Sequence, residues 1–312
     1  MDLSTAQGIY LGATGVQSVY LGSTLIWPAT QHDYSQDPLT FEVLEAGQFK
    51  FKYSSANTSQ LVMYSLDNGT HWTMMSDDTW TATIPAGSTM IFDCYEPPTN
   101  ANGIGTFSST GNFNVSGNIG SLLEGHMGFA GELFTFTTYQ FRSLFKDCTH
   151  LISAEHLWLP TLSLREGCYR EMFSGCTSLT KAPSILPATT LASYCYLSMF
   201  EGCISLIAAP ELPATSLGNS CYYRMFYNCT SLMTAPVLPA PRISTQGYYE
   251  MFRGCSSLNS VTCLATDISA GNPYEWLYNV SATGTFTKAA SMNDWTTGTS
   301  GIPSGWTIVN AS

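Results

Sequence analysis

Charged residues are scarce in this chain of 312 residues. They make up 11% of the sequence, whereas an ordinary globular protein has about 25%. Ser, Thr, Asn, Gln and Tyr must therefore cover most of the surface. This composition is unusual for a cytosolic enzyme and common in adhesins, fibres and virion components.

Basic residues are scarcer than acidic ones, with 11 Lys and Arg against 22 Asp and Glu and a net charge of −11. A surface that binds the phosphate backbone needs clustered Lys and Arg, and the sequence has no such cluster. We therefore exclude nucleic acid as a partner. The acidity also disfavours binding to an anionic membrane surface.

Long hydrophobic runs are missing as well. No stretch approaches the roughly 18 apolar residues that a membrane-spanning helix needs, so we expect no membrane insertion. Residues 1–8 contain neither a basic region nor an apolar run of about 7–15 residues, so we expect no secretory signal.

Motifs that carry catalytic chemistry are not found either. The sequence contains no Gly-x-Ser-x-Gly elbow, His-Glu-x-x-His pair, P-loop or Rossmann fingerprint. It has no Cys-x-x-Cys pair of the kind that binds zinc. Asp77-Asp78 is typical of a turn, with calcium binding as the alternative. We predict no enzyme activity, catalytic residue, cofactor or metal, although scattered carboxylates could still assemble into an acid–base pair on folding.

What is present begins with a short internal repeat. Ile9-Tyr10-Leu11-Gly12-Ala13-Thr14 is echoed by Val19-Tyr20-Leu21-Gly22-Ser23-Thr24. Each copy predicts a short strand that ends at a glycine-containing turn. We interpret residues 1–31 as a hairpin that anchors the protein to another subunit. Alternatively, it is a strand pair of the next domain.

Residues 32–105 show the period-two alternation of β-strands. We expect about six short strands forming a small β-sandwich. The segments are 39–44, 49–53, 61–66, 70–73, 81–87 and 90–94. Asn68-Gly69 predicts a hairpin turn, because both residues accept a positive φ. Residues 106–144 are expected to cap the region that follows.

The second half of the chain repeats every 25 to 28 residues, as the recurrence of one aromatic position shows. The aligned residues are Phe145, Phe173, Phe200, Phe226, Phe252 and Leu277. A repeat of this length predicts a leucine-rich-repeat solenoid over residues 145–282, with a C-terminal cap over 283–312. Trp276, Trp295 and Trp306 are expected to seal its open end.

Two residues after each aligned position stands a residue that tolerates a left-handed conformation. These residues are Asp147, Gly175, Gly202, Asn228, Gly254 and Asn279. Each follows a segment such as 168–173, which we predict to be a short helix that this residue ends. A short strand such as 179–182 should follow, and prolines in register, such as Pro183 and Pro210, should end it.

Eight of the ten cysteines also fall into register and are expected to be buried, free thiols. Tyrosines fall four residues before four of the aligned phenylalanines, and Tyr223 and Tyr249 stand beside two of them. One of these two tyrosine columns should pack inside. The other is a candidate for a surface.

The repeat Tyr196-Leu197-Ser198-Met199-Phe200-Glu201-Gly202-Cys203-Ile204-Ser205-Leu206 resembles the BspA-type leucine-rich repeat of Bacteroides surface proteins. The resemblance covers roughly residues 139–282. The extension over 209–215 resembles a subset found in gut Bacteroides and in phages that infect them. The segment over 19–24 looks like short modules near the start of phage tail and head-fibre proteins.

The resemblance implies attachment or structure and carries over no catalytic residue. Together with the expected lack of an export signal, it suggests a phage virion fibre or decoration protein, located in the virion. Its expected partners are other virion proteins, through the N-terminal segment, and a host-surface glycan or protein. By analogy with other fibres we expect a homo-oligomer, with a trimer as the guess. The alternative is a bacterial surface adhesin.

Overall fold

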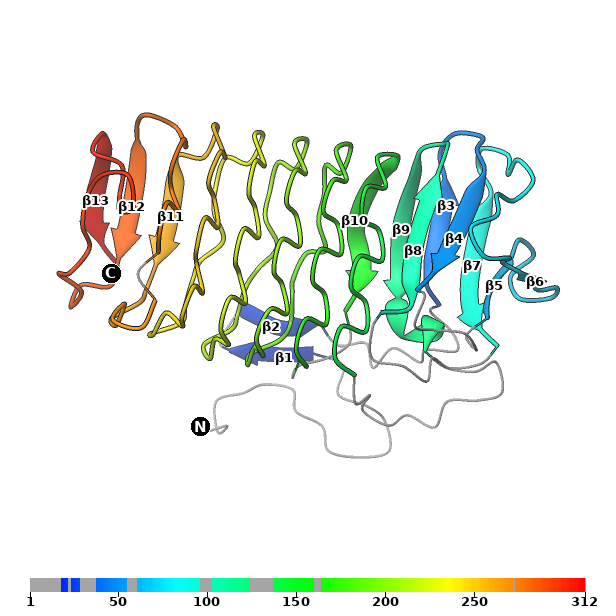
Figure 1. Cartoon of the computed structure of the whole chain (residues 1–312), viewed down its shortest axis with the longest axis horizontal. Coiled ribbons are helices and arrows are strands. Elements are labelled where there is room, and N and C mark those ends of the chain that lie inside the picture. Colours follow the sequence, from blue (N-terminus) through cyan, green and yellow to red (C-terminus); the bar gives the residue numbers. More distant parts are fainter. Residues whose placement is uncertain are drawn as a thin grey trace.

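The computed structural model describes residues 18–21, 24–28, 38–54, 61–95, 103–123, 137–159, 164–271 and 273–311. Figure 1 shows an elongated arrangement in which strands and coils of the chain stand side by side, with β13 at one end and β5 and β6 at the other. The fold is mainly β, as expected. The only helix among the described residues is the 3-10 turn η1 (Ile119–Leu122).

The N-terminal part contains an antiparallel hairpin and two sheets. The hairpin pairs β1 (Ser18–Leu21) with β2 (Thr24–Pro28). It falls on the second copy of the ten-residue repeat, and the first copy lies outside the described residues. The six-stranded sheet has the order β10-β9-β3-β7-β5-β6, and β4 pairs with β8 in a separate two-stranded sheet.

The strands of these two sheets match most of the segments expected from the sequence. Their bounds are β3 (Thr40–Val43), β4 (Phe49–Tyr53), β5 (Val62–Ser65), β6 (Thr73–Met74), β7 (Thr89–Cys94), β8 (Gly105–Ser109), β9 (Phe113–Asn118) and β10 (Leu151–Trp158). The segment 81–87 forms no strand and contributes one bridge, from Ile84 to Gly47. Pro85 follows at once and has no N–H to extend the ladder.

Strand pairing continues past residue 105, the expected end of the first β region. β8 pairs antiparallel with β4, and β9 pairs antiparallel with β3. β9 then pairs parallel with β10, which opens the repeat region. One sheet therefore runs from the N-terminal strands into the repeats without a break.

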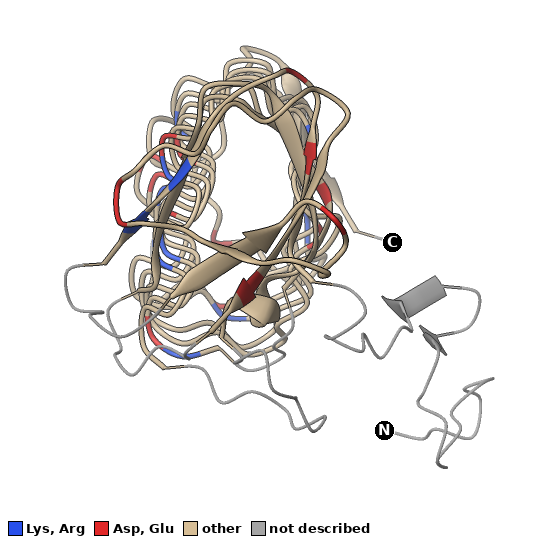
Figure 2. Cartoon of the chain, turned by 90° about the vertical axis from the view of Figure 1, so that its right-hand side faces the viewer, with Lys and Arg blue, Asp and Glu red and all other residues tan. Residues whose placement is uncertain are grey.

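The repeats form coils that stack through parallel bridges at the spacing read from the sequence. Ser153, Lys181, Ala208, Thr234 and Ser260 bridge in succession. Ser260 begins β11 (Ser260–Cys263), which pairs with β12 (Gly284–Lys288), and β12 pairs with β13 (Trp306–Asn310). Figure 2 looks along this stack and shows the coils superposed around a common axis.

The predicted helices are wrong. The segment 167–175 and its counterparts 194–202, 220–228 and 246–254, here called the turn segments, have a positive φ at every fourth residue. In the first of them φ is 61° at Gly167, 56° at Glu171 and 76° at Gly175. A right-handed helix excludes this geometry. Each turn segment is instead a run of consecutive tight turns.

Hydrogen bonds between coils explain the difference. The N–H groups of Tyr169, Glu171 and Phe173 donate to carbonyls of the next coil at 3.0, 2.8 and 2.9 Å. Between them, Met172 N–H donates to Tyr169 O at 3.2 Å, a local turn bond. Every second N–H is thus used to hold neighbouring coils together, whereas a helix would use all of them locally.

The left-handed residues themselves are confirmed. φ is positive at all six positions predicted for them, between 58° and 80°. They are Asp147, Gly175, Gly202, Asn228, Gly254 and Asn279. They end a turn segment rather than a helix, and the buried Cys column follows directly.

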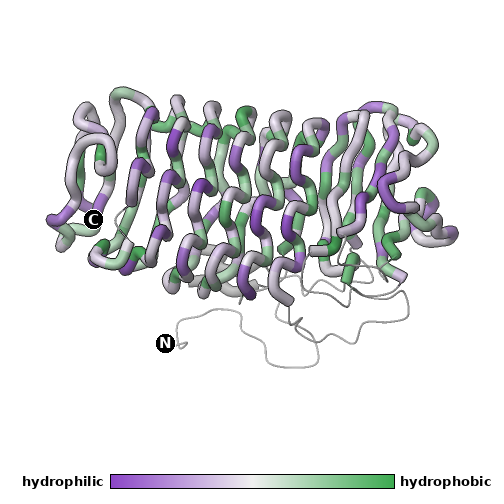
Figure 3. The backbone as a smooth tube through the Cα atoms, viewed as in Figure 1, coloured by the Kyte–Doolittle hydropathy of each residue, from purple (hydrophilic) through white to green (hydrophobic). Residues whose placement is uncertain are grey.

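Identical buried side chains stack from coil to coil, and Figure 3 shows hydrophobic and hydrophilic stretches recurring along the stack. The rings of Phe173 and Phe200 lie 5.4 Å apart with an interplanar angle of 4°. Tyr169 and Tyr196 lie 5.9 Å apart in the inner tyrosine column, which also contains Tyr222 and Tyr248. At the C-terminal end Trp276 stacks on Trp295 at 5.3 Å.

The ten cysteines are all free and buried. In the column that begins at Cys148, the four later thiols each donate a hydrogen bond to the Phe carbonyl of the preceding coil. The pairs are Cys176 to Phe145 O at 3.0 Å, Cys203 to Phe173 O at 3.1 Å, Cys229 to Phe200 O at 3.0 Å and Cys255 to Phe226 O at 2.9 Å. The thiols therefore act both as small core side chains and as links between coils.

Candidate binding face

The second tyrosine column lies on the outside of the stack. The sequence predicted this position for one of the two tyrosine columns. Tyr223 and Tyr249 stack at 4.9 Å with an interplanar angle of 6°, and Tyr249 and Tyr274 stack at 5.0 Å and 25°. Tyr274 is 45% exposed, and the other two are half-buried. Each tyrosine precedes a turn residue with positive φ, so its side chain points away from the inner column beside it.

Two arginines lie beside this column and also contact a second set of tyrosine rings. The guanidinium of Arg224 lies 5.5 Å from the ring centre of Tyr223 and 5.0 Å from that of Tyr227. Arg253 lies 6.0 Å from Tyr227 and 5.0 Å from Tyr278. Cation–π contacts of this kind hold both the rings and the guanidinium groups in place.

Two glutamates pair with these arginines across three coils. Glu250, whose side chain is 5% exposed, accepts hydrogen bonds from Arg224 Nε at 2.5 Å and from Arg253 Nη1 at 2.8 Å. Arg253 also pairs with Glu275. Partial burial opposes the charge on Arg224, but the hydrogen bond to Glu250 and nearby negative groups outweigh it and raise the pKa of the guanidinium above its ordinary value. The network combines two positive and two negative groups.

We call this surface the tyrosine face. It comprises Tyr223, Arg224, Tyr227, Tyr249, Glu250, Arg253, Tyr274, Glu275 and Tyr278. In the three preceding coils, the register position of Tyr223 holds Arg142, Arg170 and Leu197. The sequence indicated Tyr223 and Tyr249 but missed the rest. Tyr274 stands three residues before Leu277, just as Tyr249 stands three residues before Phe252, so the alignment of the repeats could have found it.

A pocket of about 340 Å³ lies elsewhere on the coils, and half of its lining residues carry hydroxyl groups. Its lining residues are Thr215, Ser216, Leu217, Asn219, Arg242, Ser244, Thr245 and Ala270. Arg242, its one charged lining residue, pairs with Asp267 at 3.3 Å. The pocket is polar and open, and it offers hydrogen bonds rather than reactive groups.

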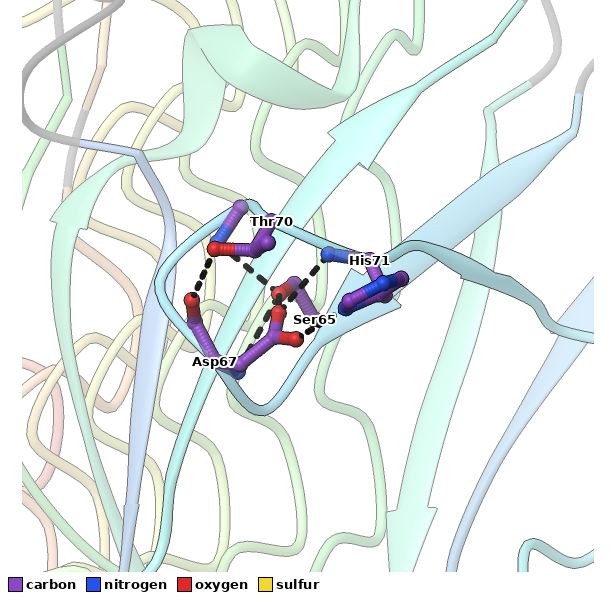
Figure 4. A network of polar contacts seen from close by, with 5 residues as sticks. Ser65, Asp67, Thr70 and His71 are labelled. Carbon is purple, nitrogen blue, oxygen red and sulfur yellow. Dashed lines mark hydrogen bonds and ion pairs between the residues drawn. The ribbon is translucent and has the colours of Figure 1, made fainter.

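A serine, an aspartate and a histidine meet in the turn after β5 (Figure 4). Ser65 Oγ donates to Asp67 Oδ1 at 2.8 Å, and His71 Nδ1 lies 2.6 Å from Asp67 Oδ2. The backbone N–H of His71 is the main cause of a lowered pKa at Asp67, with the His71 ring and the Ser65 hydroxyl adding to it. A catalytic serine needs the imidazole as its direct hydrogen-bond partner. Here the Asp67 carboxylate lies between the Ser65 hydroxyl and the His71 imidazole, so the three residues do not form a nucleophile–base pair.

This network instead fixes the predicted hairpin turn. φ is 56° at Asn68 and 85° at Gly69, and β5 pairs with β6 across it. Asp77 and Asp78 are likewise engaged in local structure. Asp77 Oδ1 accepts from Tyr53 N–H at 2.9 Å, and Asp78 pairs with Lys50 at 2.5 Å.

Across the described residues, His, Cys, Asp and Glu side chains form no group of three or more that could hold a metal ion. In the same residues no helix has the length and apolar character to cross a membrane. Comparison of the chain with protein-family models, curated proteins and solved structures finds no match.

Proposed function

We propose that the protein is a structural component of a phage virion, a fibre or decoration protein that attaches to the host surface. In this proposal the stacked coils are a leucine-rich-repeat solenoid, and the tyrosine face is its binding surface. The protein binds and does not catalyse. The observation that carries the proposal is an ordered, solvent-accessible surface of tyrosine and arginine built on three rigid coils.

Residue chemistry supports this use of the face. Tyr and Arg are enriched where proteins bind partners, because they combine large contact area with hydrogen bonding. A core position must hold an apolar side chain that fits in each coil, but a surface position is free to vary. Tyrosine at the same surface position in three successive coils, Tyr223, Tyr249 and Tyr274, therefore points to selection for contact with a partner.

The other parts have roles in the same proposal. The two sheets form a small β-sandwich that acts as a spacer, and the hairpin of β1 and β2 anchors the chain to other virion proteins. The shared sheet at β9 and β10 supports a rigid connection, since the spacer and the coils cannot swing apart without breaking strand pairs. A homo-oligomer, with a trimer as the guess, belongs to this proposal.

Proteomics of gradient-purified phage particles, from a lysate that encodes the gene, tests the proposal. We expect the protein at tens of copies or more per particle. Its absence from particles together with its presence on the bacterial cell surface would replace the virion proposal with the adhesin alternative. A second assay measures binding of the purified full chain to cells that the lysate clears, because attachment requires such binding.

A further inference from the structure

The tyrosine face has a regular period and free hydroxyl groups. Neighbouring rings of its main column repeat at 4.9 and 5.0 Å along the stack, close to the spacing of paired strands. Because Tyr249 is stacked on both sides, its ring edge and hydroxyl are what it can offer to a ligand. Within the described residues, the phenol groups of Tyr223, Tyr249 and Tyr274 make no hydrogen bond to protein atoms, and none is a buried unpartnered group.

The charges on this face are already satisfied. Arg224 and Arg253 are paired with Glu250 and Glu275, so the face has two positive and two negative groups that neutralise each other. A strongly charged ligand would have to break these ion pairs. This is unfavourable because Glu250 is almost fully buried and would be left without a partner. An uncharged ligand rich in hydroxyl groups can instead use the outer lone pairs of the Glu275 carboxylate, the remaining guanidinium N–H groups and the phenols.

The regular spacing of the tyrosine rings indicates which kind of uncharged ligand fits the face. A ligand that meets the same group in each coil must itself repeat along the stack. A linear polysaccharide in an extended conformation does so, because one pyranose ring advances by about the distance between two coils. Tyr274 ends the column and is 45% exposed, so its outer ring face is available to stack on a sugar ring.

We propose that the tyrosine face binds a neutral, linear surface polysaccharide that lies along the stack with about one sugar per coil. This inference rests on the proposed attachment function and names the partner of that same surface. The phenols and the Glu275 carboxylate hydrogen-bond to successive sugar hydroxyls, while the buried Glu250 holds Arg224 and Arg253, and these arginines hold the rings in register.

Binding of the labelled full chain to cells that the lysate clears is the assay. The probes are the neutral and the charged polysaccharide fractions of those cells, separated by anion exchange and used as competitors. We expect periodate treatment of the cells to abolish binding and protease treatment to leave it intact. The neutral fraction should compete and the charged fraction should not. Because the face is locally neutral, binding should change less than about twofold between low and physiological salt.

Substitutions on the tyrosine face test whether the ligand binds there. Tyr249→Ala removes the central ring and should weaken binding about tenfold, as truncation at the centre of a binding surface does. Tyr249→Phe, which removes only the hydroxyl, should weaken it less. Leu197→Ala, at the same register position one coil before the face, is the matched control and should bind like the wild type. Thermal unfolding of each variant shows whether the fold is kept.

The outcomes separate the two proposals. If wild-type and Tyr249→Ala chains bind cells equally well, the tyrosine face is not the site, while attachment by the protein stands. If Tyr249→Ala binds less but protease abolishes binding, or only the charged fraction competes, the partner is a protein or a charged polymer and the inference is overturned. If the wild-type chain binds no susceptible cell, the attachment function itself fails.

Discussion

The two-sheet region and the coil stack both bury phenylalanine rings, but they pack them differently. Phe41 in β3 contacts the rings of Phe49, Phe92, Phe107, Phe113 and Phe145 at interplanar angles between 38° and 71°. In the coil stack the ring of Phe226 is parallel to those of Phe200 and Phe252 within 4°. The rings around Phe41 come from strands of both sheets and from the first coil, whereas successive coils repeat one side-chain arrangement.

This difference determines how far a disturbance spreads. Phe41 links strands that are distant in sequence and also reaches Phe145 of the first coil. Among the described residues, Phe226 has ring contacts only in the coils before and after its own. A stack of this kind behaves as a chain of nearest neighbours, and the two-sheet region as one cooperative unit.

The largest expected effect comes from Phe41→Ala, which should lower the free energy of unfolding by about 3–5 kcal/mol. It opens a cavity at the centre of both sheets. We expect hydrogen exchange to accelerate throughout residues 38–123 and into the first coil. Phe226→Ala is the matched comparison, and its faster exchange should be confined to residues 194–263. Exchange that spreads equally in both variants would contradict the contrast between the regions.

Gly202→Val tests the turn segments and should cost about 1–3 kcal/mol. A Cβ at this position would meet only atoms of Gly175, at 3.9 Å, so the cost arises from a φ of 74° and not from a clash. Urea denaturation measures it. Gly202→Asn is the control, because Asn228 adopts a φ of 59° at the same place in the next coil. An unchanged midpoint for the valine variant would refute the strain at this residue.

Cys203→Ala removes the donor to the carbonyl of Phe173 and should cost about 1 kcal/mol, roughly the value of one hydrogen bond. Thiol chemistry gives an independent test of the same column. Burial raises the pKa of the Cys203 thiol well above its usual value, so native thiols should react slowly with a thiol reagent. All ten should react in denaturant without prior reduction. Fewer than three reactive thiols would show that disulfides form instead.

The smallest effect is expected at the turn of Asp67. Its pKa lies below the ordinary value of 3.8, chiefly because the N–H of His71 bonds to the carboxylate. A lowered folded pKa stabilises the turn above pH 3.8, and this contribution is lost as the pH falls towards the folded pKa. Asp67→Asn should therefore melt at a lower temperature than the wild type at neutral pH, with a difference that shrinks in acid. A difference that is constant with pH would contradict the assignment.

Several features followed from the sequence because they depend on single residues or on a period. The repeat spacing, the positive φ at Gly202 and Asn228, the buried thiols and the Asn68-Gly69 turn are of this kind. Each is set by local sterics or by the need to place identical side chains in one core. β3, β4, β5 and β7 followed from alternation, but the segment before Pro85 formed no strand, and β8 and β9 lie where a cap to the repeats was expected.

The tertiary structure decided the rest. Residues 168–173 have a local pattern compatible with a helix, and only bonds such as Phe173 N–H to Met199 O turn the segment into linked turns. The tyrosine face likewise needs three coils, since Arg224 and Glu250 meet only when neighbouring coils stack. The sequence by itself determined where the chain repeats and which side chains are buried. The bonds between coils, which no local pattern records, decided the backbone conformation and brought the tyrosine face together.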